Sequence, residues 1–363
     1  MTRLTEVSRR PDVTGGPHDS PAPARARGPH GLLWLTLRVH RASLLGWAAF
    51  AAVATAGLFY LYDIVETADR WKGCGGPGRP RCPDVDQETL FLLFTTVITY
   101  LPFAVALYAG GVLVGRDLEN DTAAFAWTQS VTPARWLAAK LAVPAVLIMA
   151  TTALLTLLQR RVWSVGNLDQ FEPWQFNDVF HATGVIGLAY TVLALALGAL
   201  AGLLVRRTLP AMGLAVAALL PVYLTFSAYR HELWPKVFKT GHEAARVNYG
   251  VALNDTGFIM DSGARVSDSS CYVPGTSADL AKCLDAHGAK DLFVEFHPDS
   301  HYWPIQFVES GIVLALAAVA LWVAFRLLRK KTATDQKARE HNPDATGPHT
   351  GRATTTSSQE AAV

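Results

Sequence analysis

The densest group of metal-ligand side chains in the sequence stands just before its last apolar block. Glu295, His297, Asp299 and His301 alternate along the chain. In an extended segment alternate side chains share one face, so two carboxylates and two imidazoles would suit a divalent metal ion. Pro298 interrupts the segment, and the apolar block follows within a few residues. We therefore expect neither a metal site nor a bound cofactor in this chain.

Glu309 is the one ionisable side chain that we place inside an apolar block, and Gln306 precedes it by about one helical turn. A charged side chain in lipid is costly, so such a residue is a candidate for a functional role. We take Gln306 and Glu309 as candidates for a substrate pathway or gate. The alternative is a water-exposed position at the outer membrane surface. His181, at the start of another block, is interpreted as an interfacial anchor.

Motifs of hydrolytic enzymes and ATPases are missing from the sequence. It contains no Gly-x-x-x-x-Gly-Lys-Ser/Thr phosphate loop, no Gly-x-Ser-x-Gly and no His-Glu-x-x-His. The apolar blocks hold no Ser–His set and no pair of acids at one depth. The chain is therefore predicted not to be an enzyme. If ATP drives its activity, another polypeptide must bind and hydrolyse the ATP.

The elements that position these residues are long apolar blocks. Half of the residues are apolar, and they fill six blocks at 44–62, 90–114, 137–158, 179–205, 209–228 and 305–325. Blocks of this length exceed the core helices of a globular domain. A bilayer offers no water to backbone amides, so each block must be helical. The sequence therefore predicts an all-α polytopic membrane protein with six transmembrane helices.

The polar segments divide the chain into further parts. Residues 1–30 and 332–363 are predicted to be disordered cytoplasmic tails, since their composition is polar and low in complexity. Spans one to five fall within 31–228 and span six within 304–331. Residues 229–303 are predicted to form a small folded extracytoplasmic insertion, with turns and a helix near 277–286.

Basic residues beside the blocks favour one orientation. Those expected on the cytoplasmic side are Arg38, Arg41, Arg116, Arg135, Lys140, Arg206, Arg207, Arg326, Arg329, Lys330 and Lys331. Those that oppose this orientation are Arg70, Lys72, Arg79, Arg81, Arg160 and Arg161. The balance predicts a multi-pass protein of the cell membrane with both termini in the cytoplasm.

All four cysteines fall in segments that this orientation places outside the cell. Cys74 and Cys82 lie in the first outer loop, and Cys271 and Cys283 lie in the insertion. Disulfides persist outside the reducing cytoplasm, so we expect two of them. Local pairing is the simplest of the three possible connectivities. A four-cysteine zinc site is the alternative, but the short Cys-x-x-Cys spacing is missing.

The segment between the second and third blocks is expected to carry a short inner helix. Asp117, Glu119 and Asp121 would lie in its first turns, where the helix dipole favours negative charge. Thr132 and Pro133 suit the N-cap and first position of the third span. On these residues alone, an interfacial connector is the simpler interpretation.

Three segments resemble one family of membrane proteins. The first joins Gly115-Arg-Asp-x-Glu-x-x-Thr122 to Trp127-Thr-Gln-Ser-Val-Thr-x-x-Arg135-Trp-Leu-x-x-Lys140. The second is Gly198-x-x-x-Gly202-Leu-Leu-x-Arg206-Arg-Thr-Leu-Pro-Ala-Met212, and the third is His297-Pro-x-Ser-x-x-Trp303-Pro-x-Gln306-x-x-Glu309. Together they cover spans two to six, and in this order they resemble actinobacterial type 2 ATP-binding-cassette permeases. The sequence departs from the family pattern at Asp121 and at Pro133.

The resemblance implies a permease that docks a separate cytoplasmic cassette ATPase. Docking is then assigned to the inner segment, through Asp117, Glu119, Thr122, Trp127, Gln129 and Ser130. The resemblance also implies a homodimer or a heterodimer of permeases, and Gly198 with Gly202 would allow close helix approach between copies or within one chain. We expect export of a small or amphipathic molecule. The alternative is a membrane sensor or scaffold whose insertion binds a ligand and whose inner loop recruits a partner.

Overall fold

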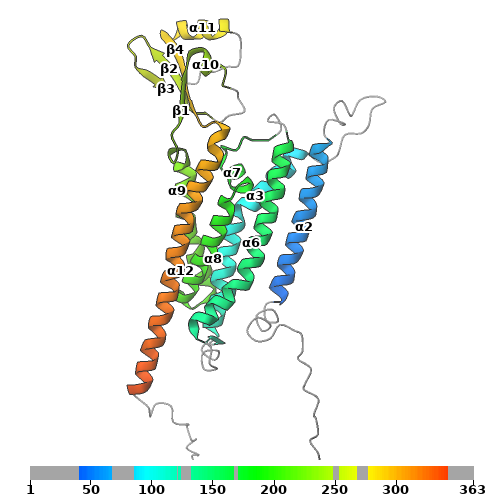
Figure 1. Ribbon diagram of the computed structural model, residues 1–363, viewed down its shortest axis with the longest axis vertical. Coiled ribbons are helices and arrows are strands. Elements are labelled where there is room, and N and C mark those ends of the chain that lie inside the picture. Colours follow the sequence, from blue (N-terminus) through cyan, green and yellow to red (C-terminus); the bar gives the residue numbers. More distant parts are fainter. Residues whose placement is uncertain are drawn as a thin grey trace, which may run out of the picture.

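The computed structural model describes residues 41–67, 86–120, 122–123, 132–166, 171–247, 253–267 and 277–341. Within these residues, six helices are long and apolar enough to cross a membrane. They form one bundle with a small sheet at one end, and the helix ends nearest the two termini lie at the other end (Figure 1). The predicted all-α polytopic membrane architecture is confirmed, with the sheet as an addition to it.

The membrane helices extend beyond the apolar blocks at nearly every end. They are α2 (Arg41–Glu66), α3 (Gln87–Leu107) with its continuations η2 (Tyr108–Gly115) and α4 (Arg116–Glu119), α6 (Pro133–Val165), α8 (Ile186–Val205), α9 (Thr208–Tyr229) and α12 (Tyr302–His341). Caps set two of these ends: Asp86 accepts from the backbone of Glu88 and Thr89, and Thr132 accepts from that of Arg135. α12 runs past residue 331, where the sequence predicted a tail, to His341.

Span four differs from its prediction. The block 179–205 is not one helix, because α7 (Asn177–Thr183) ends and α8 begins again at Ile186. Gly184 takes an extended backbone between them. A Cβ at Gly184 would lie 1.9 Å from Nε2 of Gln306, so only glycine fits beside that amide. Apolar residues continue through the interruption, which is why hydropathy did not reveal it.

α8 lies at the centre of the bundle and packs against α12, η2, α9 and α3. Its glycines permit this close packing. A Cβ at Gly198 would lie 2.5 Å from Cβ of Ala109, and one at Gly202 would lie 2.8 Å from Cβ of Val114. The pair therefore serves helix packing within the chain. The facing segment η2 is a π-helix, a form that is rare and frequent at functional sites.

The insertion contains a four-stranded antiparallel sheet in the order β1-β4-β2-β3. Its elements are β1 (Val237–Thr240), α10 (Gly241–Ala245), β2 (Leu253–Met260), β3 (Arg265–Ser267), α11 (Ser277–Ala286) and β4 (Ala289–Phe296), and the short 3-10 helices η3 (Arg230–Glu232) and η4 (Asp299–His301) flank them. Leu292, Val294 and Phe296 alternate along β4 and form an apolar core with Phe258 and Ala244. The helix expected near 277–286 is present as α11, whereas the sequence analysis named no strands.

Cys283 lies on α11 and packs against the apolar core of the sheet. Cys74, Cys82 and Cys271 fall outside the described residues, as do residues 1–30 and 342–363. The two local cysteine pairs therefore stay a prediction.

Candidate functional site

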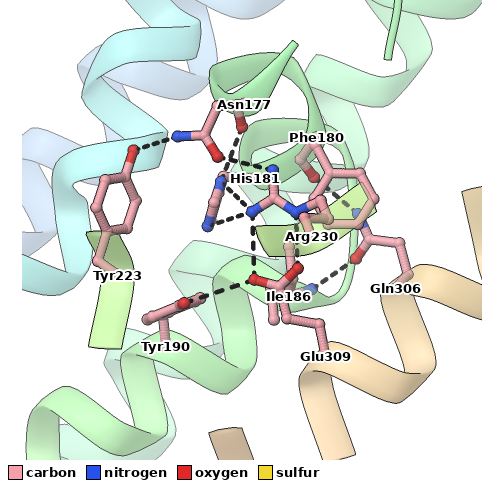
Figure 2. A network of polar contacts seen from close by, with 9 residues as sticks. All are labelled: Asn177, Phe180, His181, Ile186, Tyr190, Tyr223, Arg230, Gln306 and Glu309. Carbon is pink, nitrogen blue, oxygen red and sulfur yellow. Dashed lines mark hydrogen bonds and ion pairs between the residues drawn. The ribbon is translucent and has the colours of Figure 1, made fainter. Parts of the chain in front are cut away.

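A buried ion pair joins α12 to the end of α9 near the sheet. Arg230 follows α9 directly, and its Nε lies 2.7 Å from Oε2 of Glu309 while Nη2 lies 3.2 Å from Oε1. Glu309 has no exposed surface and Arg230 is 5% exposed. A two-point contact of this kind is a strong way to hold a carboxylate and guanidinium away from water. The pair places opposite charges together inside the bundle (Figure 2).

α7 supplies the next contacts of Arg230. Nη1 donates to Oδ1 of Asn177 at 2.7 Å, and Nη2 lies within 3.4 Å of both ring nitrogens of His181. Nδ1 of His181 lies 2.8 Å from the carbonyl oxygen of Asn177, which fixes the ring. The guanidinium also lies over the ring of Phe180, 4.1 Å from its centroid. The short helix α7 thus surrounds Arg230 on three sides.

Two tyrosines extend the network into α8 and α9. Nδ2 of Asn177 donates to the hydroxyl of Tyr223 at 2.7 Å, and the hydroxyl of Tyr190 donates to Oε1 of Glu309 at 3.5 Å. The rings of Tyr190 and Tyr223 also pack edge to face. Residues of α7, α8, α9, η3 and α12 therefore meet in one set of polar contacts, as Figure 2 shows.

Gln306 holds the interruption between α7 and α8. Its Nε2 donates to the carbonyl of Phe180 at 2.8 Å, and its Oε1 accepts from the backbone N–H of Ile186 at 2.9 Å. The last carbonyls and first N–H groups of helices lack intrahelical partners, and burial without partners is costly. One amide side chain from α12 therefore satisfies both ends of the interruption.

Aromatic side chains and Arg160 surround this network. The guanidinium of Arg160 lies 4.8 Å from the ring centroid of Tyr302 and 4.6 Å from that of Trp303. Nη1 of Arg160 donates to the carbonyl of Thr183 at 3.4 Å. Arg160 is one of the basic residues that opposed the predicted orientation. In the structure its charge is held by contacts with the end of α7 and with two aromatic rings.

The structure therefore brings both candidate gate residues together in the interior. The alternative of a water-exposed Glu309 does not hold, and His181 is 2% exposed and central to the network rather than an interfacial anchor. Sequence reasoning missed Arg230, since it was assigned to the insertion. The available signal was its position directly after an apolar block, opposite a buried carboxylate that needed a partner.

Two contacts within the chain hold the first residues of the predicted docking segment. Oε2 of Glu119 accepts from the backbone N–H of Thr208 at 2.9 Å and from its hydroxyl. Asp117 forms an ion pair with Lys140 on α6 and accepts, through its backbone carbonyl, from the hydroxyl of Thr122 at 3.1 Å. The segment is thus tied to the first turns of α6 and α9, at the end of the bundle opposite the sheet. Trp127, Gln129 and Ser130 fall outside the described residues.

The alternating ligand-type side chains near residue 300 do not converge. Nδ1 of His297 lies 3.1 Å from Nδ1 of His301. Oδ1 of Asp299 instead accepts from Nε1 of Trp174 at 2.9 Å, and Glu295 lies 3.7 Å from Arg265. Within the described part of the chain, no group of three such side chains is placed to hold a metal ion.

The buried network consists of an ion pair and hydrogen bonds, and its residues include no nucleophile placed beside a general base. A family model described as ABC-2 membrane transporter related matches residues 43–230. Searches of curated proteins and of solved structures return no match.

Proposed function

The chain belongs to the ABC-2 membrane transporter related family, and from this premise we propose that it is the permease subunit of an ATP-driven exporter. The proposed cargo is a small or amphipathic molecule, and the proposed energy source is a cassette ATPase on a separate polypeptide. The observation that carries the proposal is the family match over five of the six spans, including the inner segment between spans two and three.

The buried network supports a closed outer gate. Arg230, Glu309 and Gln306 connect α7, α8, η3 and α12 at the end of the bundle that carries the sheet. Charged side chains inside a membrane bundle are costly, so a buried set of them is a candidate for a pathway or a switch. Hydrogen bonds and ion pairs of this kind are either formed or broken, and a gate needs two such discrete states. In the proposal these contacts break when the pathway opens outward.

The contacts of the inner segment support the proposal of an ATPase partner. Glu119 connects the segment to Thr208 in the first turn of α9, and the other end of α9 is followed by Arg230. α9 is continuous from Thr208 to Tyr229, so a movement of its first turn would be passed along the helix to Arg230. We assign docking to Trp127, Gln129 and Ser130 together with Asp117, Glu119 and Thr122. Two permeases, identical or different, would then stand above two ATPases.

The test is purification of the tagged chain from its native membranes, followed by mass-spectrometric identification of cassette ATPases. Trp127→Ala should abolish their recovery. Trp322→Ala is the matched control, since Trp322 is a tryptophan 59% exposed on a membrane span, and it should retain the ATPase. Wild-type chain that recovers no ATPase would refute the proposal and favour the sensor or scaffold alternative. Equal recovery by both variants would refute the docking assignment alone.

A further inference from the structure

A cavity of about 230 Å³ lies between three membrane helices, away from the buried network. Its lining comes from α2, η2 and α6, through Ser43, Leu44, Trp47, Tyr108, Pro144, Leu147 and Ile148. Ser43 lies in the first turn of α2, at the end of the bundle opposite the sheet. The cavity therefore opens within the half of the membrane nearer the inner segment.

Two departures from regular α-helix meet at this cavity. Tyr108 begins the π-helix η2, which widens the helix by one residue per turn. Pro144 stands inside α6, where it has no N–H to donate to the preceding turn and its ring clashes with a carbonyl of that turn, which favours a kink. The space between α2 and its neighbours is thus built into the backbone of two helices.

The lining is mostly apolar and carries no charged side chain. Nε1 of Trp47 donates to Oγ1 of Thr151 at 3.0 Å. Because its N–H is already bonded, the indole contributes apolar surface to the cavity. The polar groups of the lining are the hydroxyls of Ser43 and Tyr108. A charged group placed here would lose water without gaining a partner. An apolar cavity of about 150 Å³ admits benzene, so this one has room for a ring or a short chain.

We propose that this cavity binds the apolar chain or ring of an amphiphile, with an uncharged hydroxyl or carbonyl end beside Ser43 and Tyr108. The ligand enters sideways from the bilayer, because α2 lies at the surface of the bundle with 17% of its apolar window buried. Its source is either a membrane lipid or the exported molecule. The second assignment rests on the proposed function, whereas binding itself does not.

The test uses the purified full-length chain and a photoreactive decanol that carries a diazirine, with labelled residues mapped by mass spectrometry. Saturable labelling is expected at residues 43–47 and 144–148, and unlabelled decanol should compete for it. Leu44→Trp fills the cavity and should lower this labelling at least about fivefold, a loss of about 1 kcal/mol of binding free energy. Leu45→Trp is the control, since Leu45 is 69% exposed to lipid on the same turn.

A second pair of variants covers the case in which Leu44→Trp fails to fold. Leu147→Trp should block the cavity from α6, and Val146→Trp, at a position 69% exposed, should leave labelling unchanged. Labelling that does not saturate, or that is equal in cavity and control variants, overturns the proposal.

Extraction of bound molecules from wild type and Leu44→Trp then separates the two sources. A phospholipid lost only from Leu44→Trp identifies a lipid site, and a non-lipid amphiphile lost in the same way identifies the cargo; both outcomes support the cavity. Because the chain is measured without the ATPase, a negative result leaves the permease assignment unaffected.

Discussion

At the scale of single residues, Glu309 is buried without exposed surface because Arg230 neutralises it. Removing one member of a buried pair leaves an uncompensated charge, which typically destabilises by about 3–5 kcal/mol. Glu309→Ala should therefore lower thermal stability strongly in detergent, and Arg230→Met with Glu309→Leu should recover most of the loss. Glu232→Ala, which breaks the exposed Glu232–Lys236 pair, should change stability by less than about 1 kcal/mol. Equal losses from Glu309→Ala and Glu232→Ala would contradict the role of the buried pair.

Gly184 offers a second test at the residue scale. Its missing side chain leaves room for the amide of Gln306, which bridges α7 and α8. Gly184→Ala should displace that amide and destabilise the chain by about 1–3 kcal/mol. Gly213→Ala provides the control on another span, because nothing lies within 4 Å of a Cβ there. If both variants melt at the same temperature, the bridge is not a structural requirement.

At the scale of elements, Glu119 contacts the first turn of α9 and is also assigned to ATPase docking. Hydrogen exchange separates these two roles. In the structure Glu119 accepts from the first N–H of α9, as a cap does. Glu119→Ala should therefore speed amide exchange at residues 208–211 of the isolated chain, and Trp127→Ala should not. If exchange is unchanged while ATPase recovery falls, Glu119 acts in docking alone and the proposed link to α9 is wrong.

The junction between the sheet and α12 should weaken in acid. Burial lowers the pKa of His297, whose Nε2 lies 3.1 Å from the carbonyl oxygen of His231. A histidine with a lowered folded-state pKa contributes full stability above its ordinary pKa, near 6.5, and loses it as pH falls toward the lowered value. Proteolysis between the sheet and α12 should therefore accelerate from pH 7.5 to pH 5. His297→Gln should flatten this dependence, and an unchanged dependence would exclude His297 as its cause.

The sequence predicted the elements of the bundle better than their interruptions. Six apolar blocks gave six spans, since a block of about 20 apolar residues satisfies its own backbone hydrogen bonds in lipid by forming a helix. The gap at Gly184 escaped notice because Gln306, remote in sequence, satisfies the freed backbone groups. The burial of Arg230 was not predicted, because a charge just outside an apolar block is expected to be solvated unless its partner, here Glu309, is known. The strands escaped because β2 and β4 pair across a long sequence separation.

At the scale of the whole molecule, the two ends of the bundle differ in kind. One end holds the sheet and the buried network, and the other holds the inner segment and the opening of the apolar cavity. α9 spans the distance between Glu119 and Arg230. This arrangement separates the site where energy would enter from the contacts that would open.

The most direct test of the account asks whether nucleotide at the ATPase opens the buried network. Ser310 neighbours Glu309, is 7% exposed and has no hydrogen-bond partner for its hydroxyl, so Ser310→Cys is a mild probe. In the complex with the ATPase, a non-hydrolysable ATP analogue should raise its labelling by a membrane-impermeant maleimide about tenfold or more, which corresponds to a shift of about 1.4 kcal/mol. Ser262→Cys, in the exposed turn after β2, should label at one rate throughout. Labelling of Ser310→Cys that does not respond to nucleotide would contradict the gate.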